Sequence, residues 1–96
     1  MSEQQQLVQV QASDGVMEIR INRPDRKNAL THAMYDALTA ALNEAEQSSS
    51  IRVTLITGTE DCFTAGNDMV DFLQSPPKGD SSPVMLFLRK LVELEK

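Results

Sequence analysis

Polar and apolar residues alternate along two short segments near the start of the chain, residues 7–12 and 16–22. Such alternation places apolar side chains on one face of a β-strand and polar side chains on the other. The apolar positions of one face are Val8, Val10 and Ala12 in the first segment and Met17, Ile19 and Ile21 in the second. Between the segments, Asp14 and Gly15 tolerate the positive φ angles of a two-residue hairpin turn. The pattern predicts an antiparallel β-hairpin with one polar face.

The next segment has helical periodicity. Between Thr31 and about Gln47, apolar residues recur every three or four positions, as an amphipathic helix requires. These residues are Ala33, Met34, Ala37, Leu38, Ala41, Leu42 and Ala45. Thr31 is a suitable N-cap, and Leu30 and Tyr35 have the spacing of a hydrophobic staple.

Residues 53–57 form a short apolar run after this helix. Val53, Leu55 and Ile56 predict a strand that is buried on both faces, which is typical of parallel sheets. A hairpin, a helix and a strand in this order predict a βαβ crossover, and therefore an α/β fold.

The last third of the chain predicts two more helices. Asp68 is a candidate N-cap for a short helix over residues 69–73, and Ser82 with Pro83 is a candidate start for a helix over residues 84–95. The second helix is apolar around most of its circumference, so it needs partners on several sides. We therefore interpret residues 1–96 as the N-terminal part of a single larger domain. The alternative is a small α+β domain that dimerises through this helix.

We expect residues 1–6 to be disordered, because they are polar and terminal. Residues 74–82 contain two prolines, a glycine and three serines, and we expect them to form a mobile connector.

Charge and cysteine content restrict the class of protein. A net charge of −5 argues against a nucleic-acid or anionic-membrane surface, and no apolar run reaches the length of a membrane span. The single cysteine, Cys62, forms no internal disulfide, so we expect a cytoplasmic protein. The single histidine, His32, excludes a multi-histidine metal site within this chain, and we expect no metal and no cofactor. We interpret His32 as an exposed helix-start residue and Cys62 as a packed thiol rather than a nucleophile.

Two motifs resemble the crotonase family, the enoyl-CoA hydratases and isomerases. These motifs are INRPDRKNAL at residues 21–30 and RVTLITGTEDCFTAGNDMVDF at residues 52–72, separated by the predicted helix. The resemblance implies ββα repeats, of which this chain holds the first part, and assembly into a homotrimer or hexamer. Asn67 stands where many hydratases of the family have alanine, and this variant is most similar to the Δ3,Δ2-enoyl-CoA isomerase branch.

The resemblance also implies the chemistry of the second motif. These enzymes stabilise a thioester enolate with two backbone N–H groups, and one donor is the residue after the glycine, here Asn67. Gly66 lacks a Cβ and would let the thioester approach the backbone. The residues that would line the thioester site are Ala65, Gly66, Asn67, Asp68 and Met69. The alternative is that this segment is only a turn capped by Asp68.

By the same resemblance, the first motif would hold the phosphates and adenosine of coenzyme A. The candidates are Arg26, Lys27 and the backbone around Ala29. The alternative for each cation is a solvated side chain on a surface turn.

The family's second oxyanion donor and its glutamate acid–base residues lie beyond the second motif, in segments that this chain does not contain. We therefore predict an acyl-CoA enzyme of the hydratase/isomerase type whose residues 1–96 alone are inactive. The substrate would be an acyl-CoA thioester, with neither nucleic acid nor membrane as a partner. The alternatives are a non-catalytic acyl-CoA-binding or interaction module and a small structural domain.

Overall fold

The computed structural model describes residues 7–74 and 82–94. The elements in chain order are β1 (Val8–Ser13), β2 (Val16–Ile21), the 3-10 helix η2 (Pro24–Arg26), α1 (His32–Gln47), β3 (Val53–Thr57), α2 (Met69–Gln74) and α3 (Pro83–Glu93). The predicted hairpin, crossover helix, strand, short helix and final helix are all present, and the predicted α/β class is confirmed. The predictions for residues 1–6 and 75–81 lie outside the described residues. At the ends of the predicted connector, Gln74 belongs to α2 and Ser82 caps α3.

Strands β1 and β2 form the predicted antiparallel hairpin, with Ser13 paired to Val16 across the turn. Asp14 has a φ of 55° and Gly15 a φ of 84°, as a two-residue turn of the primed type requires. On β2, Met17, Ile19 and Ile21 are buried. The alternating pattern therefore predicted the inward face of β2 correctly.

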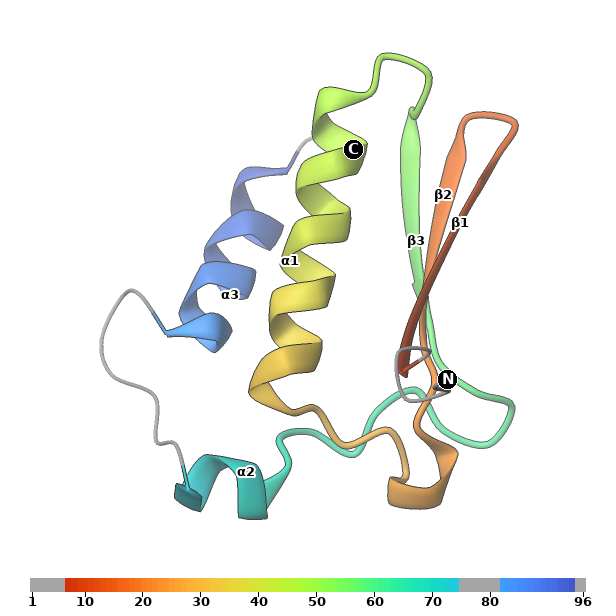
Figure 1. The fold of residues 1–96 in the computed structure, drawn as a ribbon. Helices are drawn as coiled ribbons and strands as arrows, with labels where there is room; N and C mark the ends of the chain where they lie inside the picture. Colours follow the sequence, from red (N-terminus) through yellow and green to blue (C-terminus); the bar gives the residue numbers. More distant parts are fainter. Residues whose placement is uncertain (1–6, 75–81, 95–96) are drawn as a thin grey trace.

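Helix α1 connects β2 to β3, which pair in parallel with Ile19 opposite Ile56. The strand order is β1-β2-β3, so β2 is the central strand of a three-stranded sheet. Thr31 caps α1 by accepting a hydrogen bond from the N–H of Met34 at 3.1 Å. In Figure 1 α1 lies between the sheet and α3.

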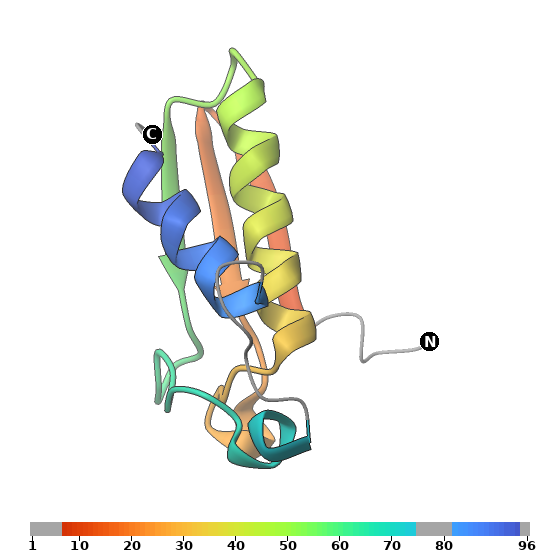
Figure 2. The same ribbon diagram turned by 90° about the vertical axis from the view of Figure 1, so that its left-hand side faces the viewer.

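The core lies where α1 meets the sheet and α3. It includes Ile19 and Leu42, which are completely buried, and Val84 and Phe87 of α3 pack against it. Figure 2 shows α3 alongside α1, and Lys90 of α3 lies 2.7 Å from Glu46 near the end of α1. Contact with α3 explains why Tyr35 of α1 is buried, whereas Ala33 and Ala37, at the margins of the predicted apolar stripe, are exposed.

The prediction that β3 is buried on both faces is wrong. The register places Thr54 and Ile56 on the side of α1, whereas Val53 and Leu55 face the other way and are 50% and 49% exposed. The described residues provide no layer over that side of the sheet near β3. Five apolar side chains of α3 are also exposed: Met85, Leu86, Leu88, Leu91 and Val92.

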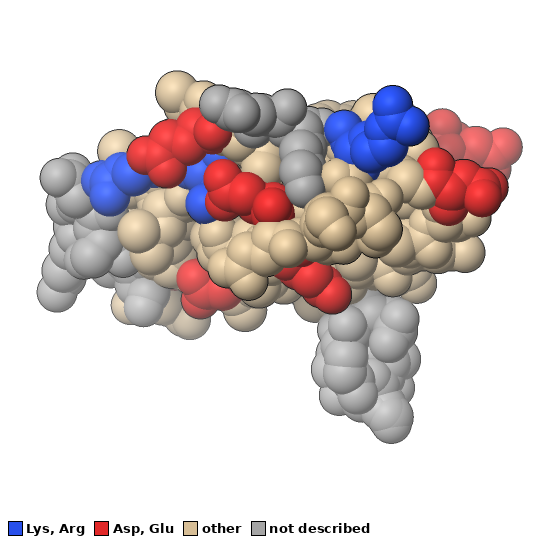
Figure 3. Space-filling model, turned by 90° about the horizontal axis from the view of Figure 1, so that it is seen from above, with Lys and Arg blue, Asp and Glu red and all other residues tan. Residues whose placement is uncertain are grey.

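Acidic and basic side chains are interspersed on the end of the molecule that carries the hairpin turn (Figure 3). None of the helices in the described part of the chain has both the length and the apolar character needed to cross a membrane.

Candidate functional site

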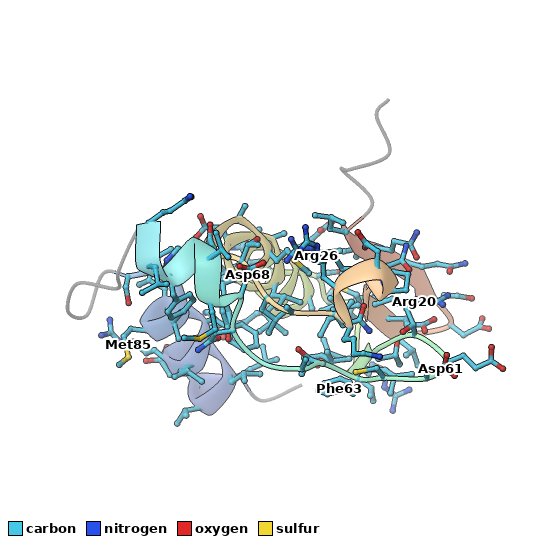
Figure 4. The ribbon with its side chains drawn as sticks, turned by 90° about the horizontal axis from the view of Figure 1, so that it is seen from below. Arg20, Arg26, Asp61, Phe63, Asp68 and Met85 are labelled. Carbon is cyan, nitrogen blue, oxygen red and sulfur yellow. The ribbon has the colours of Figure 1, made fainter. Side chains whose placement is uncertain are left out.

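The two recognised motifs meet at one end of the sheet. Parallel strands end at the same edge, so the loops that follow β2 and β3 leave the sheet side by side, at the end where α2 also lies (Figure 1). The first loop comprises residues 22–31 and the second loop residues 58–68. Seen from that end in Figure 4, Arg26 belongs to the first loop, whereas Phe63 and Asp68 belong to the second. The fold therefore brings together two segments that are far apart in the sequence.

Asn28 is the centre of the contact between the two loops. It is completely buried, and its amide nitrogen donates to the hydroxyl of Thr59 at 3.0 Å and to the carbonyls of Cys62 and Phe63 at 2.7 and 3.2 Å. Its amide oxygen accepts from the N–H of Arg23 at 2.6 Å. Lys27 and Asn28 have φ angles of 53° and 60°, in the left-handed region that asparagine tolerates better than most residues. One side chain thus holds both loops in place.

Below Asn28 the loops pair through their backbones. The N–H of Ala65 donates to the carbonyl of Lys27, that of Leu30 to the carbonyl of Gly66, and that of Asp68 to the carbonyl of Leu30, at 2.7 to 3.0 Å. These bonds make Leu30 and Asn67 an isolated parallel bridge. The loop of residues 65–68 is therefore a short strand-like segment.

This pairing has a direct consequence for Asn67. In a parallel bridge, a residue whose two neighbours bond to the other segment directs its own N–H away from that segment. The N–H groups of Ala65, Gly66 and Asp68 are all used, the second by the hydroxyl of Thr64 at 3.1 Å. The N–H of Asn67 donates to no acceptor among residues 7–74 and 82–94, and Asn67 is exposed. It is a backbone donor available to a ligand.

Gly66 provides the space beside this donor. Its φ of 97° favours glycine, and no atom lies within 4 Å of the place where a Cβ would stand. The backbone is therefore open on this side of Gly66.

The side chain of Asn67 is held by α1. The hydroxyl of Tyr35 donates a hydrogen bond to the amide oxygen of Asn67. Burial raises the pKa of Tyr35. The hydroxyl therefore keeps its proton at neutral pH and remains a donor.

Asp68 and Asp71 fasten α2 to the rest of the site. Asp68 accepts from the N–H of Asp71 at 2.9 Å, as the predicted N-cap does, and its other oxygen lies 2.8 Å from Nη1 of Arg23. These two contacts, the N–H first, lower the pKa of Asp68. Asp71 in turn accepts from the N–H of His32 at 2.7 Å.

His32 is not the exposed residue that its position at the start of α1 predicted. Its side chain is only 14% exposed, because its ring stacks on Phe72 of α2 with centroids 4.7 Å apart. The contact with α2, which is distant in the sequence, covers this histidine.

The predicted cations and the other candidate residues lie around the loops. Arg26 and Lys27 are exposed. Lys27 borders a cleft of about 450 Å³ between the loops, which is also lined by Arg20, Asn22, Pro24, Thr59, Glu60, Asp61 and Cys62. Arg26 and Asp68 border a second cleft of about 240 Å³.

Among the other candidate residues, Ala65 and Met69 are exposed, and Ala29 is half-buried. Within the described residues, no group of three or more His, Cys, Asp or Glu side chains could hold a metal ion.

The family profile for "Enoyl-CoA hydratase/isomerase" matches residues 11–95, which is most of the chain. The chain belongs to the enoyl-CoA hydratase/isomerase family. Among curated proteins, enoyl-CoA delta isomerase 2 of Homo sapiens is 40% identical over 70 residues, which cover 73% of this chain and 18% of that protein.

Solved structures of the family have the same fold. Pseudomonas aeruginosa OdaA superposes with a TM-score of 0.89 at 46% identity, over 97% of this chain and 36% of that one. The enoyl-CoA hydratase/isomerase of Pseudoalteromonas atlantica has a TM-score of 0.86 at 36% identity, over 94% and 36% of the two chains. The chain thus spans between about a fifth and about a third of the length of these relatives.

The structure brings Ala65–Asp68 next to the segment that follows Lys27. The roles predicted for these residues in ligand binding stay predictions. Sequence reasoning missed three structural residues of the site: Arg23, Asn28 as a side-chain hub, and Tyr35 as the partner of Asn67. A signal existed for Tyr35, since a tyrosine on the apolar side of a helix needs a partner for its hydroxyl.

Proposed function

We propose that this family member binds an acyl-CoA thioester at the two loops, and that the N–H of Asn67 is one donor of an oxyanion hole. The observation that carries the proposal is the backbone of residues 65–68, where only the N–H of Asn67 is unused by the described residues, next to the open side of Gly66. A backbone donor held in place by the fold stabilises developing negative charge without reorganisation, and one such donor is worth about 2.7–4 kcal/mol in the transition state.

The coenzyme A end of the ligand is assigned to the first loop. Arg26 and Lys27 are exposed cations that can reach phosphate groups, and Ala29 lies near them, with its N–H bonded to Arg26 and its carbonyl to Arg23. Asp68 is a less suitable ligand contact, because Arg23 and the start of α2 already occupy its carboxylate.

The reaction class that we propose for the whole protein is isomerisation or hydration of an enoyl-CoA, with no cofactor other than the coenzyme A of the substrate. The Asn67 variant and the similarity to an enoyl-CoA delta isomerase favour isomerisation. A homotrimer or hexamer is part of the proposal, since the exposed apolar residues of β3 and α3 would be covered in a larger assembly. A cytoplasmic location stays a prediction.

We further propose that residues 1–96 alone bind acyl-CoA without converting it. The carboxylates nearest to Asn67 along the chain are engaged, Asp68 with Arg23 and Asp71 with the N–H of His32. A general base must reach the proton that it removes, and these contacts hold both carboxylates toward Arg23 and α1. This observation favours the second candidate function, an acyl-CoA-binding module.

Two assays separate these possibilities. Calorimetric titration of the chain with hexanoyl-CoA and with coenzyme A tests binding, and we expect both to bind. Spectrophotometric assays with a 2-enoyl-CoA and a 3-enoyl-CoA test conversion, first with this chain and then with the protein purified at its natural length. Conversion by the natural protein supports the enzyme, whereas binding without conversion by that protein supports the binding module. Absence of binding would contradict both.

A further inference from the structure

We propose that Tyr35 is a positioning residue for the oxyanion donor, because its hydroxyl holds the Asn67 side chain beside the unused backbone N–H. This inference rests on the proposed function, since it assigns to Tyr35 the orientation of a donor that the proposed function assigns to Asn67. Tyr35 itself does not touch the reacting atoms.

The geometry makes Tyr35 a rigid support. Its side chain projects from the first turn of α1, is only 7% exposed, and packs against the ring of Phe87 with centroids 5.4 Å apart. A buried ring that packs against another ring has little rotational freedom, so the hydroxyl occupies a fixed place. Its hydrogen bond to Asn67 therefore transmits that fixed place to the loop.

Asn67 needs such a support. The bond from Leu30 holds the carbonyl of Gly66, which shares a peptide unit with the N–H of Asn67, but Asn67 is exposed and its own N–H and carbonyl make no bond to Leu30. The contact with Tyr35 is the side-chain hydrogen bond that ties Asn67 to the core. The bond from Leu30 fixes the carbonyl of the peptide between Gly66 and Asn67, and the bond from Tyr35 fixes the Asn67 side chain at the other end of that peptide. Together the two bonds restrain the direction of the N–H.

The test replaces Tyr35 by phenylalanine, which removes the hydroxyl and keeps the ring. The probe is hexanoyl-CoA labelled with 13C at the thioester carbonyl, bound to the chain of residues 1–96, and the readout is the infrared band of that carbonyl. A hydrogen bond from Asn67 lowers the band frequency. We expect Tyr35→Phe to reduce this shift by about half or more, while the Kd changes by about twofold or less, because the coenzyme A end supplies most of the binding.

Two variants serve as controls. Thr39→Val removes another buried hydroxyl of α1, one turn from Tyr35 and without a partner among the described residues, and it should leave the band unchanged. Asn67→Ala keeps the backbone N–H and removes the acceptor of the tyrosine hydroxyl. It should reduce the band shift as Tyr35→Phe does, and the double variant should show no further loss, as expected for two residues that act through one contact.

The outcomes are distinct. A wild-type chain that binds hexanoyl-CoA without any shift of the carbonyl band would contradict the proposed function itself, and this inference with it. A wild-type shift that persists in full in Tyr35→Phe would overturn only the role of Tyr35. If Tyr35→Phe does not fold, Asn67→Ala decides, because Asn67 is exposed, and a full shift in that variant would overturn the inference.

Discussion

Nη1 of Arg23 lies 2.8 Å from Oδ2 of Asp68 and 3.0 Å from the carbonyl oxygen of Ala29. One guanidinium therefore joins the loop after β2 to the residue that caps α2. Both side chains are largely buried, at 17% and 14% exposure, so solvent screens this pair less than a surface ion pair. The pair connects the two halves of the candidate site.

The bonds to Asp68 from the N–H of Asp71 and from Arg23 predict a loss of stability in acid. The pKa of Asp68 is lowered in the folded chain, so its contribution is fully present above the ordinary carboxylate pKa of 3.8 and is lost as the pH falls through the lowered value. Chemical unfolding measured from neutral pH into the acid range should show a decline that Asp68→Asn reduces. An equal decline in wild type and variant would contradict this.

Asp68 both caps α2 and pairs with Arg23, and substitutions by asparagine and by alanine distinguish these two roles. Asparagine still caps a helix, whereas alanine does not, so Asp68→Ala should lower the melting temperature more than Asp68→Asn does. The same melting temperature for both variants would mean that the cap contributes nothing.

Asn28 should be among the most sensitive positions of the described chain. Asn28→Ala removes four hydrogen bonds from a buried site and leaves the N–H of Arg23 and the hydroxyl of Thr59 without this partner. We expect a loss of about 2–4 kcal/mol in the free energy of unfolding, measured by urea titration. Asn28→Asp keeps the acceptor for Arg23 but places charge against two carbonyls, so it should not restore stability. If Asn28→Ala lowers the free energy of unfolding by less than about 0.5 kcal/mol, the claim that Asn28 holds the two loops together is contradicted.

A side chain at position 58 should destabilise the fold, because backbone atoms of the same loop lie next to Gly58. A Cβ at this residue would lie 2.4 Å from the carbonyl oxygen of Cys62 and 2.5 Å from Cα of Phe63, both of them backbone atoms. Gly58→Ala should therefore cost about 1–3 kcal/mol of unfolding free energy or more. Gly66→Ala is the comparison, because there the space is open and only the positive φ opposes a Cβ, at a cost of about 1–2 kcal/mol. Equal melting temperatures for wild type and Gly58→Ala would show that the backbone is free to move there.

Arg26 and Lys27 should affect binding and not folding. Both are exposed, and replacement of either by alanine should raise the Kd for coenzyme A by about two- to fivefold, with a smaller effect at high salt. Arg52→Ala is the matched control, since Arg52 is an exposed cation beside Gly15 at the hairpin end. Calorimetric titration at two ionic strengths measures the difference. A similar Kd for coenzyme A in Arg26→Ala, Lys27→Ala and wild type would show that these two cations do not contribute to the binding site.

The sequence predicted the elements well because their signals are local. Asp14-Gly15 predicted the turn, Thr31 and Ser82 predicted two caps, and the periodicity of β2 predicted its buried face, all from neighbours along the chain. The proximity of the two loop motifs was not predicted, because it follows from the parallel pairing of β2 with β3.

The errors have a common cause in contacts between distant segments. The exposure predicted for His32 is wrong because the ring of Phe72, which is distant in the sequence, stacks on it. For Val53 and Leu55 the error has the opposite sign. Their apolar character predicted burial, but the described residues provide no layer that covers them. Arg23 and Asp68 each have ordinary local explanations, and only the fold shows that they pair.

The most direct test of the proposed site is the amide resonance of Asn67. The chain, labelled with 15N, is titrated with coenzyme A and separately with hexanoyl-CoA, which adds the thioester carbonyl. We expect both ligands to shift resonances around Arg26 and Lys27, and only hexanoyl-CoA to move the Asn67 amide proton downfield, as a new hydrogen bond requires. A bound thioester that leaves the Asn67 amide unchanged would contradict its role as an oxyanion donor.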